Sequence, residues 1–221
     1  MRLHGTEKEV LMRARARGSG AVKLLLGAVF VAFSFAGCGL SSATITIHYT
    51  PQRQPADVPG AGAVQVQVEV EDQRPVKDRV GTKILESVPI LAANDVVELL
   101  RKSIEQELAN RGYRIGAGQV VVKVELEKFW NTFANMFAFF RCVGEVIFAV
   151  RVKDPAGNVL FAERVVGAFE HSAQVVSGGN AQESVEGALR EAIRKLMGND
   201  AFPAALGKAA TASSSGGEKR D

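Results

Sequence analysis

The sequence predicts a two-layer α+β domain, in which two helices pack on one face of a mainly antiparallel sheet of about four to five strands. Several segments alternate apolar and polar residues with a period of two, which is typical of half-buried strands. Two other segments carry apolar residues at spacings of three and four, which is typical of amphipathic helices. The expected order of the elements is β-α-β-β-β-α.

Residues 44–49 alternate and are compatible with a short strand within the leader segment. The first strand of the expected order covers residues 64–71, where valines alternate with Gln and Glu. A proline at position 75 ends it, and residues 76–91 read as a longer loop or irregular strand. The clearest helix covers 95–111. Asp95 and the glutamate three residues later resemble a capping box, and a glycine follows where a left-handed C-terminal residue is expected.

Three more strands and a second helix follow. Residues 154–158 (DPAGN) predict a tight turn, so the last two strands form a hairpin. The second helix begins with Asn180 or Ser177 as its cap, and a short amphipathic piece follows near residues 201–206. The predicted ranges of these strands and of the helix are 119–129, 143–153, 159–169 and 180–197.

An uncharged apolar run precedes Cys38, and a basic stretch precedes that run. This layout is typical of a bacterial secretory signal peptide. The segment Phe35-Ala36-Gly37-Cys38 resembles the lipobox of bacterial lipoproteins. The resemblance implies that residues 1–37 are removed and that Cys38 carries covalent lipid, with acyl chains such as palmitate, as the membrane anchor. Apart from this lipid, no cofactor is expected.

The alternative for this segment is a transmembrane helix with a structural cysteine. The apolar run, residues 24–37, is shorter than the roughly 20 residues needed to cross a bilayer. Met12 would give a more compact signal than Met1. Gly39 stands where an aspartate would mark retention in the inner membrane, so the resemblance favours the outer membrane and a domain that faces the periplasm.

Composition excludes some functions. The chain is +3, but residues 1–37 hold six Lys/Arg and two Glu, so the remainder has 21 basic and 22 acidic residues. This near-neutral part has no electrostatic footprint for nucleic acid. We expect a linker over 38–62, one domain over 63–206 and a disordered tail over 207–221. Cys142 is expected to be a buried small hydrophobe.

Catalytic and metal-binding patterns are weak. His48, His171 and Cys142 are far apart in the sequence and show no paired ligand spacing, so we expect no metal. Ser172 neighbours His171, but adjacent strand residues face opposite ways. There is no G-x-S-x-G or Walker A pattern. We therefore expect that the protein is not an enzyme and has no catalytic residues.

The segment 129–140 places six aromatic residues in the expected connection between two strands. A connecting loop is normally polar. These side chains either cover one end of the sheet and complete the core, or form an exposed patch that contacts the membrane or a partner. The candidate contact residues are Trp130, Phe133, Met136, Phe137, Phe139 and Phe140.

Four features together resemble the YajG family of bacterial lipoproteins. They are the lipobox cysteine, the segment TITIHYTPQ, the strand ending in VEDQR and the helix ending in ELANRGYRIG. The resemblance covers most of residues 38–206 and implies a membrane-anchored, periplasm-facing α+β domain without known catalytic residues. The aromatic segment and the tail depart from it. Asp72 and Arg74 match its DQR. We interpret them as a turn-stabilising carboxylate and a surface arginine, with ligand binding as the alternative.

The function expected from these observations is a non-catalytic interaction or auxiliary module of the cell envelope. Its partners would be the membrane, through the anchor, and an envelope protein. The alternative is a carrier or receptor for a small apolar or lipid ligand in a cavity between sheet and helices, lined by residues such as Phe148, Phe161 and Phe169. An enzyme whose dispersed residues converge in space is the third possibility.

Overall fold

The computed structural model describes residues 41–51, 58–83, 87–118, 120–154 and 156–215. The signal segment, Gly39 and Cys38 lie outside the described residues. The compact unit that holds the fold starts at Ser42. Ile45 and Ile47 are buried in its hydrophobic core. Part of the expected linker 38–62 is therefore built into the domain.

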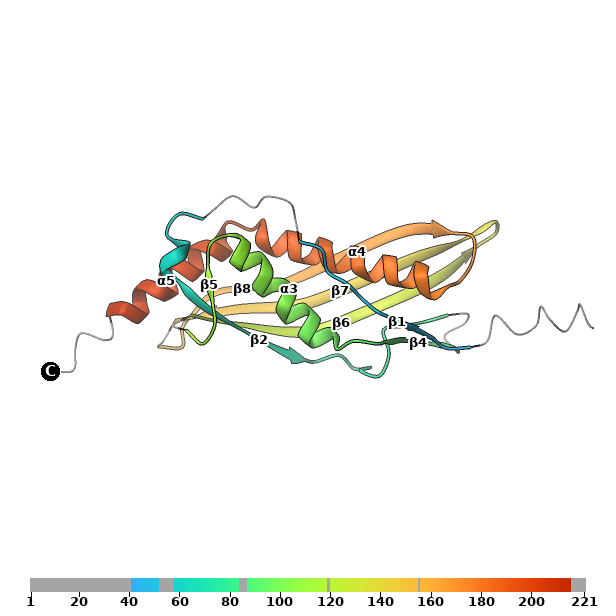
Figure 1. The fold of residues 1–221 in the computed structure, drawn as a ribbon, viewed down its shortest axis with the longest axis horizontal. Helices are drawn as coiled ribbons and strands as arrows, with labels where there is room; N and C mark the ends of the chain where they lie inside the picture. Colours follow the sequence, from blue (N-terminus) through green and yellow to red (C-terminus); the bar gives the residue numbers. More distant parts are fainter. Residues whose placement is uncertain (1–40, 52–57, 84–86, 119, 155, 216–221) are drawn as a thin grey trace, which may run out of the picture. The chain divides into compact units, whose positions relative to one another are not determined.

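The described residues form eight strands, three α-helices and one short 3-10 helix (Figure 1). The helices are α3 (Val96–Asn110), α4 (Gly178–Met197) and α5 (Ala201–Ser215), and the 3-10 helix is η1 (Ala61–Ala63). The strands are β1 (Ala43–Ile45), β2 (Gln65–Asp72), β3 (Gly81–Thr82), β4 (Pro89–Ala92), β5 (Arg114–Ile115), β6 (Val120–Met136), β7 (Phe139–Lys153) and β8 (Val159–Ala173).

Strand β6 organises the sheet. Strand β7 pairs antiparallel with it along its length, and β8 pairs antiparallel with β7. The other edge of β6 is shared: β2 pairs with its first half from Val66↔Val120 onward, and β3 meets its second half at Gly81↔Asn131. Strand β5 continues the sheet beyond β2, and β4 and β1 continue it beyond β3.

The α+β class is confirmed, but the sheet has more strands and more parallel strand pairs than expected. It has eight strands among the described residues rather than four to five. It is mixed, since the pairs β1/β4, β2/β5, β2/β6 and β3/β6 are all parallel. The parallel β2/β6 pair follows from the crossover through α3, because a helix between two neighbouring strands returns the chain in the same direction.

The helix ends follow the sequence closely. Asp95 caps α3 by accepting hydrogen bonds from the backbone N–H groups of Val97 (2.8 Å) and Glu98 (3.3 Å). The Glu98 side chain pairs with an arginine on the next turn instead of closing the capping box. Gly112 adopts the left-handed conformation expected of it, with φ 91°. Ser177, one of the two expected residues, caps α4.

A third helix replaces the expected tail. Residues 207–215 continue α5 rather than being disordered, and Ala209 is fully buried on that helix. The ring of Phe202, also on α5, packs against Phe161 of β8 with a centroid distance of 5.4 Å. One hydrophobic cluster contains side chains from all three helices and from the sheet. The prediction of two helices was therefore one helix short.

Helix α4 lies unusually close to β7 and β8. A Cβ added at Gly144 would fall 2.0 Å from the carbonyl oxygen of Ser184, and one at Gly167 would fall 2.1 Å from that of Ala188. Only glycine fits at both positions. These two glycines are thus the points where the helix backbone meets the sheet.

The opposite face of the sheet carries ion pairs between strands, most of them between neighbours. Lys123 pairs with Glu69 at 3.8 Å, and Arg164 pairs with Glu127 at 2.7 Å. Two further pairs join β6 to β7, namely Arg151–Glu125 and Lys128–Glu145. Glu69, Glu125 and Glu127 therefore lie on a charged outer face, which is the polar side of the alternating strands. Each such exposed ion pair contributes about 0–1 kcal/mol to stability.

Candidate functional site

The aromatic segment 129–140 forms a β-hairpin, which corrects the expectation of a loop. Strand β6 runs to Met136, the chain turns at Phe137 and Ala138, and β7 starts at Phe139. The pairing Met136↔Phe139 closes the hairpin. The candidate contact residues consequently sit on regular strand backbone, which fixes the direction of each side chain.

A β-bulge in β6 sets which of these side chains enter the core. The register shifts between Leu126 and Lys128. Before it the buried side chains are even-numbered, as in Val124 and Leu126, and after it they are odd-numbered, as in Phe129 and Asn131. The extra residue moves the inward face by one position, which is the usual effect of a bulge.

The two interpretations of the aromatic segment each hold for part of it. Phe129 is fully buried in the core, and Trp130, Phe133 and Phe140 are half-buried. The three residues at the end of the hairpin are exposed: Met136 at 40%, Phe137 at 110% and Phe139 at 38% of their full accessible surface. We call Met136, Phe137 and Phe139 the apolar tip. The base of the hairpin completes the core, and the apolar tip is an exposed patch.

Trp130 lies away from the tip. It faces Glu145 across the β6/β7 pair, after the bulge, on the side of the sheet that carries the ion pairs. It lines a groove of about 400 Å³ together with Pro75 and Val76. The tryptophan therefore belongs to the outer face of the sheet, and the structure does not group it with the tip residues.

Arg74 is buried, which corrects the expectation of a surface arginine. It is 6% exposed and forms a two-pronged ion pair with Asp72, with both N···O distances at 2.9 Å. Asp72 also accepts the backbone N–H of Arg74 at 3.1 Å. Burial alone would raise the pKa of Asp72, but the hydrogen bonds and positive charge of Arg74 outweigh it and lower that pKa. This geometry agrees with a turn-stabilising carboxylate.

A small polar cluster lies inside the β6/β7/α4 interface, and sequence reasoning missed it. The side-chain amide of Asn131 donates to Ser184 Oγ at 2.8 Å and to Cys142 Sγ at 3.1 Å. Cys142 in turn contacts the carbonyl oxygen of Asn180 at 3.2 Å. All three side chains are fully buried. The one signal was an asparagine within an aromatic run, which by itself indicates no partner.

Cys142 is buried, as predicted, and unpaired. Burial raises the pKa of its thiol, although hydrogen bonds from Ser184 and Asn131 act in the opposite direction. A buried thiol with a raised pKa is a poor nucleophile at neutral pH, because the thiolate is the reactive form. This position supports a packing role for the side chain.

The two histidines among the described residues have different recorded partners. His171 faces α4, where its Nε2 is 3.7 Å from Glu183 Oε2, whereas the neighbouring Ser172 is exposed on the other side of the strand. The backbone N–H of His48 donates to Glu186. Across the part of the chain that the structure describes, no three His, Cys, Asp or Glu side chains gather in a way that could hold a metal ion.

These elements define an α+β domain with an exposed apolar hairpin tip. The chain belongs to the Lipoprotein_16 family of uncharacterised lipoproteins, whose sequence profile matches residues 51–206. No curated protein matches the sequence. None of the described helices is both long and apolar enough to span a membrane.

Solved structures resemble the chain at low sequence identity, and the first one named here shares its fold. A protein from Xanthomonas campestris is 11% identical with a TM-score of 0.54, over 77% of this chain and 98% of that one. A minor lipoprotein from Acinetobacter baumannii is 14% identical with a TM-score of 0.37, over 66% and 95%. A lipoprotein from Neisseria meningitidis is 9% identical with a TM-score of 0.35, over 54% and 91%.

Proposed function

We propose that this lipoprotein is anchored through lipid on Cys38, faces the periplasm, and acts as a non-catalytic interaction or auxiliary module for an envelope protein. The observation that carries the proposal is the lipobox-like Phe35–Cys38 segment, which ends four residues before the folded unit at Ser42 of a lipoprotein-family domain. Gly39 favours the outer membrane as the destination. The finer resemblance to the YajG family is consistent with the same placement.

The buried charged side chains support a structural rather than catalytic role. Glu107, fully buried on α3, accepts the Tyr49 hydroxyl at 2.7 Å and pairs with Arg111 one turn later. Burial and the Glu107 carboxylate raise the pKa of Tyr49. This contact holds the segment after β1 against α3. Like the Asp72–Arg74 pair, it satisfies its charges internally.

The three phenylalanines that would line a ligand cavity are engaged in packing. Phe148 is fully buried in the core, and Phe161 packs against a ring of α5. Phe169 lies under α4, where a Cβ added at Gly187 would fall 2.3 Å from its ring. The carrier alternative therefore draws no support from these residues, and the interaction module is the function we favour.

The proposal is tested by expressing the full-length chain beside Cys38→Ala in a Gram-negative host. We expect the unsubstituted protein in the outer-membrane fraction, with an intact mass that corresponds to lipidated chain starting at Cys38. The Cys38→Ala variant should lose both properties. Cys142→Ala is the matched control, because its thiol is buried in the fold, and it should fractionate as the unsubstituted protein. An unprocessed or soluble wild-type protein would contradict the anchor.

The partner is sought in the same cells by crosslinking and affinity capture of the lipidated protein. An envelope protein captured with the unsubstituted chain, but not with the mislocalised Cys38→Ala variant, is the expected result. Capture that recovers no envelope protein in repeated experiments would count against an interaction module and return attention to the carrier alternative.

A further inference from the structure

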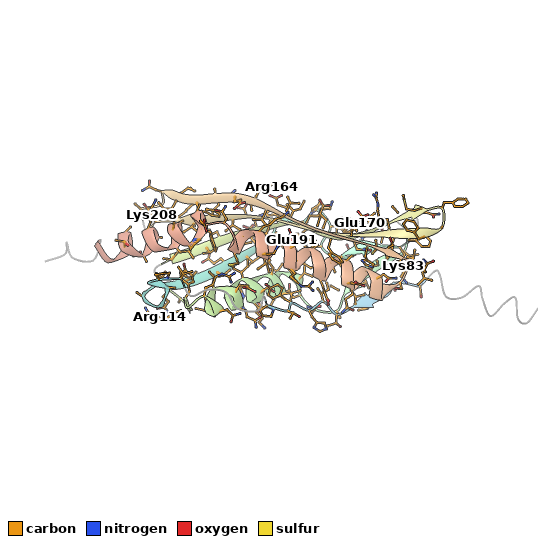
Figure 2. All side chains as sticks on the ribbon, turned by 90° about the horizontal axis from the view of Figure 1, so that it is seen from above. Lys83, Arg114, Arg164, Glu170, Glu191 and Lys208 are labelled. Atoms are coloured by element: carbon orange, nitrogen blue, oxygen red, sulfur yellow. The ribbon has the colours of Figure 1, made fainter. Side chains whose placement is uncertain are left out.

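Most of the exposed large hydrophobic side chains gather at one end of the sheet. Besides the apolar tip, Val175 is 61% exposed, and it follows Ala173 of β8, which pairs with Phe140 of β7. Only Val159, at the start of β8, is exposed at the opposite end among the described residues. Figure 2 shows the two ends, with Glu170 and Lys83 near the tip and Lys208 and Arg114 far from it.

The described chain enters the fold at the tip end. Helix α4 starts there, since Cys142 near the hairpin contacts the carbonyl of Asn180 in its first turn. A Cβ at Gly178, the first residue of α4, would lie 3.2 Å from the Cβ of Ala43 in β1. The chain then runs away from the tip, because the backbone N–H of His48 reaches Glu186, further along α4. The N-terminal end of β1 therefore points toward the tip.

The chain between Cys38 and β1 is long enough for a lipid on Cys38 and the apolar tip to meet the same membrane surface. Cys38 is five residues before Ala43, and five residues span at most about 18 Å. The strand pairings through β4 and β3 place Ala43 level with Asn131 of β6, and Phe137 lies six residues further along, which is about 20 Å of strand. The two lengths are nearly equal, so a lipid on Cys38 can reach the level of the tip without unfolding β1.

The uncharged, mostly apolar side chains of the tip are suited to the hydrocarbon core and the interface of a membrane rather than to water. Residues 134–140 carry no charge. The first charged side chain after the turn, Arg141, lies 3.8 Å from Glu170 on β8. Insertion of the turn would therefore bury apolar side chains before any charge reaches the membrane, and burial of charge is what opposes insertion.

We propose that the apolar tip inserts into the membrane leaflet that holds the lipid on Cys38, an inference that rests on the anchor of the proposed function. Lipid and tip then form two attachment points at one end of the domain. They orient the sheet relative to the membrane and leave α5 and the start of β8 on the far side. A lipid chain and a second apolar contact together bind a membrane more stably than either alone.

The test places a single tryptophan at the tip. Trp130 is the one tryptophan of the chain. The lipidated full-length protein carrying Trp130→Phe and Phe137→Trp is reconstituted into phosphatidylethanolamine–phosphatidylglycerol vesicles, with and without brominated acyl chains. The matched control carries Trp130→Phe and Val159→Trp, which puts the fluorophore at the other exposed end of the sheet. Flotation of the vesicles reports the anchor separately.

We expect both variants to float and only the tryptophan at position 137 to show a blue-shifted emission and quenching by the brominated chains. Flotation without quenching at position 137 would overturn the insertion, because the tip would then lie in water or on a protein, while the anchor would stand. Failure to float would overturn both proposals. Far-UV circular dichroism verifies folding. If Trp130→Phe unfolds the chain, Phe137→Trp is measured with Trp130 retained and its spectrum subtracted.

Discussion

At the scale of single residues, Arg74 shows how a short sequence motif acts within this fold. Its guanidinium is buried beside Asp72, two residues earlier at the end of β2, and it also reaches the carbonyl oxygen of Lys77 at 3.4 Å. The DQR motif thus fastens the turn that takes the chain out of the sheet. Removing one partner would leave a buried charge without compensation, which is costly.

Asp72→Asn should lower the free energy of unfolding by about 1–3 kcal/mol at pH 7. The folded-state pKa of Asp72 lies below its unfolded value. Its stabilisation is therefore present above the unfolded pKa and is lost as pH falls through the folded pKa. Urea titrations should show the difference between the two proteins shrinking below about pH 4. Asp78→Asn, at a side chain that is 75% exposed, is the control and should change little.

Gly144→Ala tests the close approach of α4. The added methyl would overlap the carbonyl oxygen of Ser184, so the helix must shift or the strand must distort. We expect a loss of about 3 kcal/mol in the free energy of unfolding, measured by urea denaturation. Gly207→Ala on α5 is the matched control. It meets no atom within 4 Å and should be neutral or stabilising by up to about 1 kcal/mol. Equal effects of the two substitutions would contradict the packing described.

At the scale of elements, the periodic segments were predictable and the short or phase-shifted ones were not. The alternation over 64–71 and the apolar spacing over 95–111 correspond to β2 and α3 within one or two residues. The bulge near Leu126 shifts the inward face of β6 by one residue. The aromatic run beyond it consequently loses the simple alternation of a strand, and a loop was predicted in its place.

The missed strands have a different physical cause. Strand β5 has two residues, which is too short for a period of two to be recognised. Strands β1 and β3 have three and two residues, and they fall in or next to the segments 44–49 and 76–91, for which a short or irregular strand was one interpretation outside the expected order of elements. These three strands exist because β4, β6 and β2 offer partners from distant parts of the chain. Likewise, the exposure of the apolar tip depends on where the hairpin ends relative to α4, and a single sequence does not contain that distance.

Helix α5 provides the prediction at this scale. The composition of its second half, from residue 207 onward, suggested disorder, yet Ala209 is fully buried and Lys208 beside it is exposed. Ala209→Asp should lower the free energy of unfolding by about 2–4 kcal/mol, since it would bury a charge. Lys208→Asp should change it by less than about 0.5 kcal/mol. Urea unfolding of both variants decides the matter, and a neutral Ala209→Asp would show that α5 does not pack on the domain.

At the scale of the whole molecule, β6 joins the two parts of the sheet. Its first half pairs with β2 and its second half with β3, while β7 pairs along both. Helix α4 crosses β6, β7 and β8 and holds the parts together from one side (Figure 1). We therefore expect the domain to unfold as one cooperative unit, as domains of this size usually do.

Val124→Ala tests this cooperativity from one half of β6 to the other. Val124 is buried between Val70 of β2 and Val150 of β7, and its truncation should cost about 2 kcal/mol. Trp130 lies in the second half of β6 and reports that half by fluorescence. Its unfolding midpoint in urea should fall together with the midpoint measured by far-UV circular dichroism. If the midpoint measured by Trp130 fluorescence is unchanged while the midpoint measured by circular dichroism falls, the domain contains two independently folding parts.

Cys142 has a practical consequence. It is the sole cysteine among the described residues, and its thiol is sealed between the sheet and α4. A cysteine introduced on the surface of this domain would therefore be the thiol that a spin label or dye reaches first. Two such labels, one on α5 and one near the hairpin, would report how the domain is oriented relative to a lipid surface.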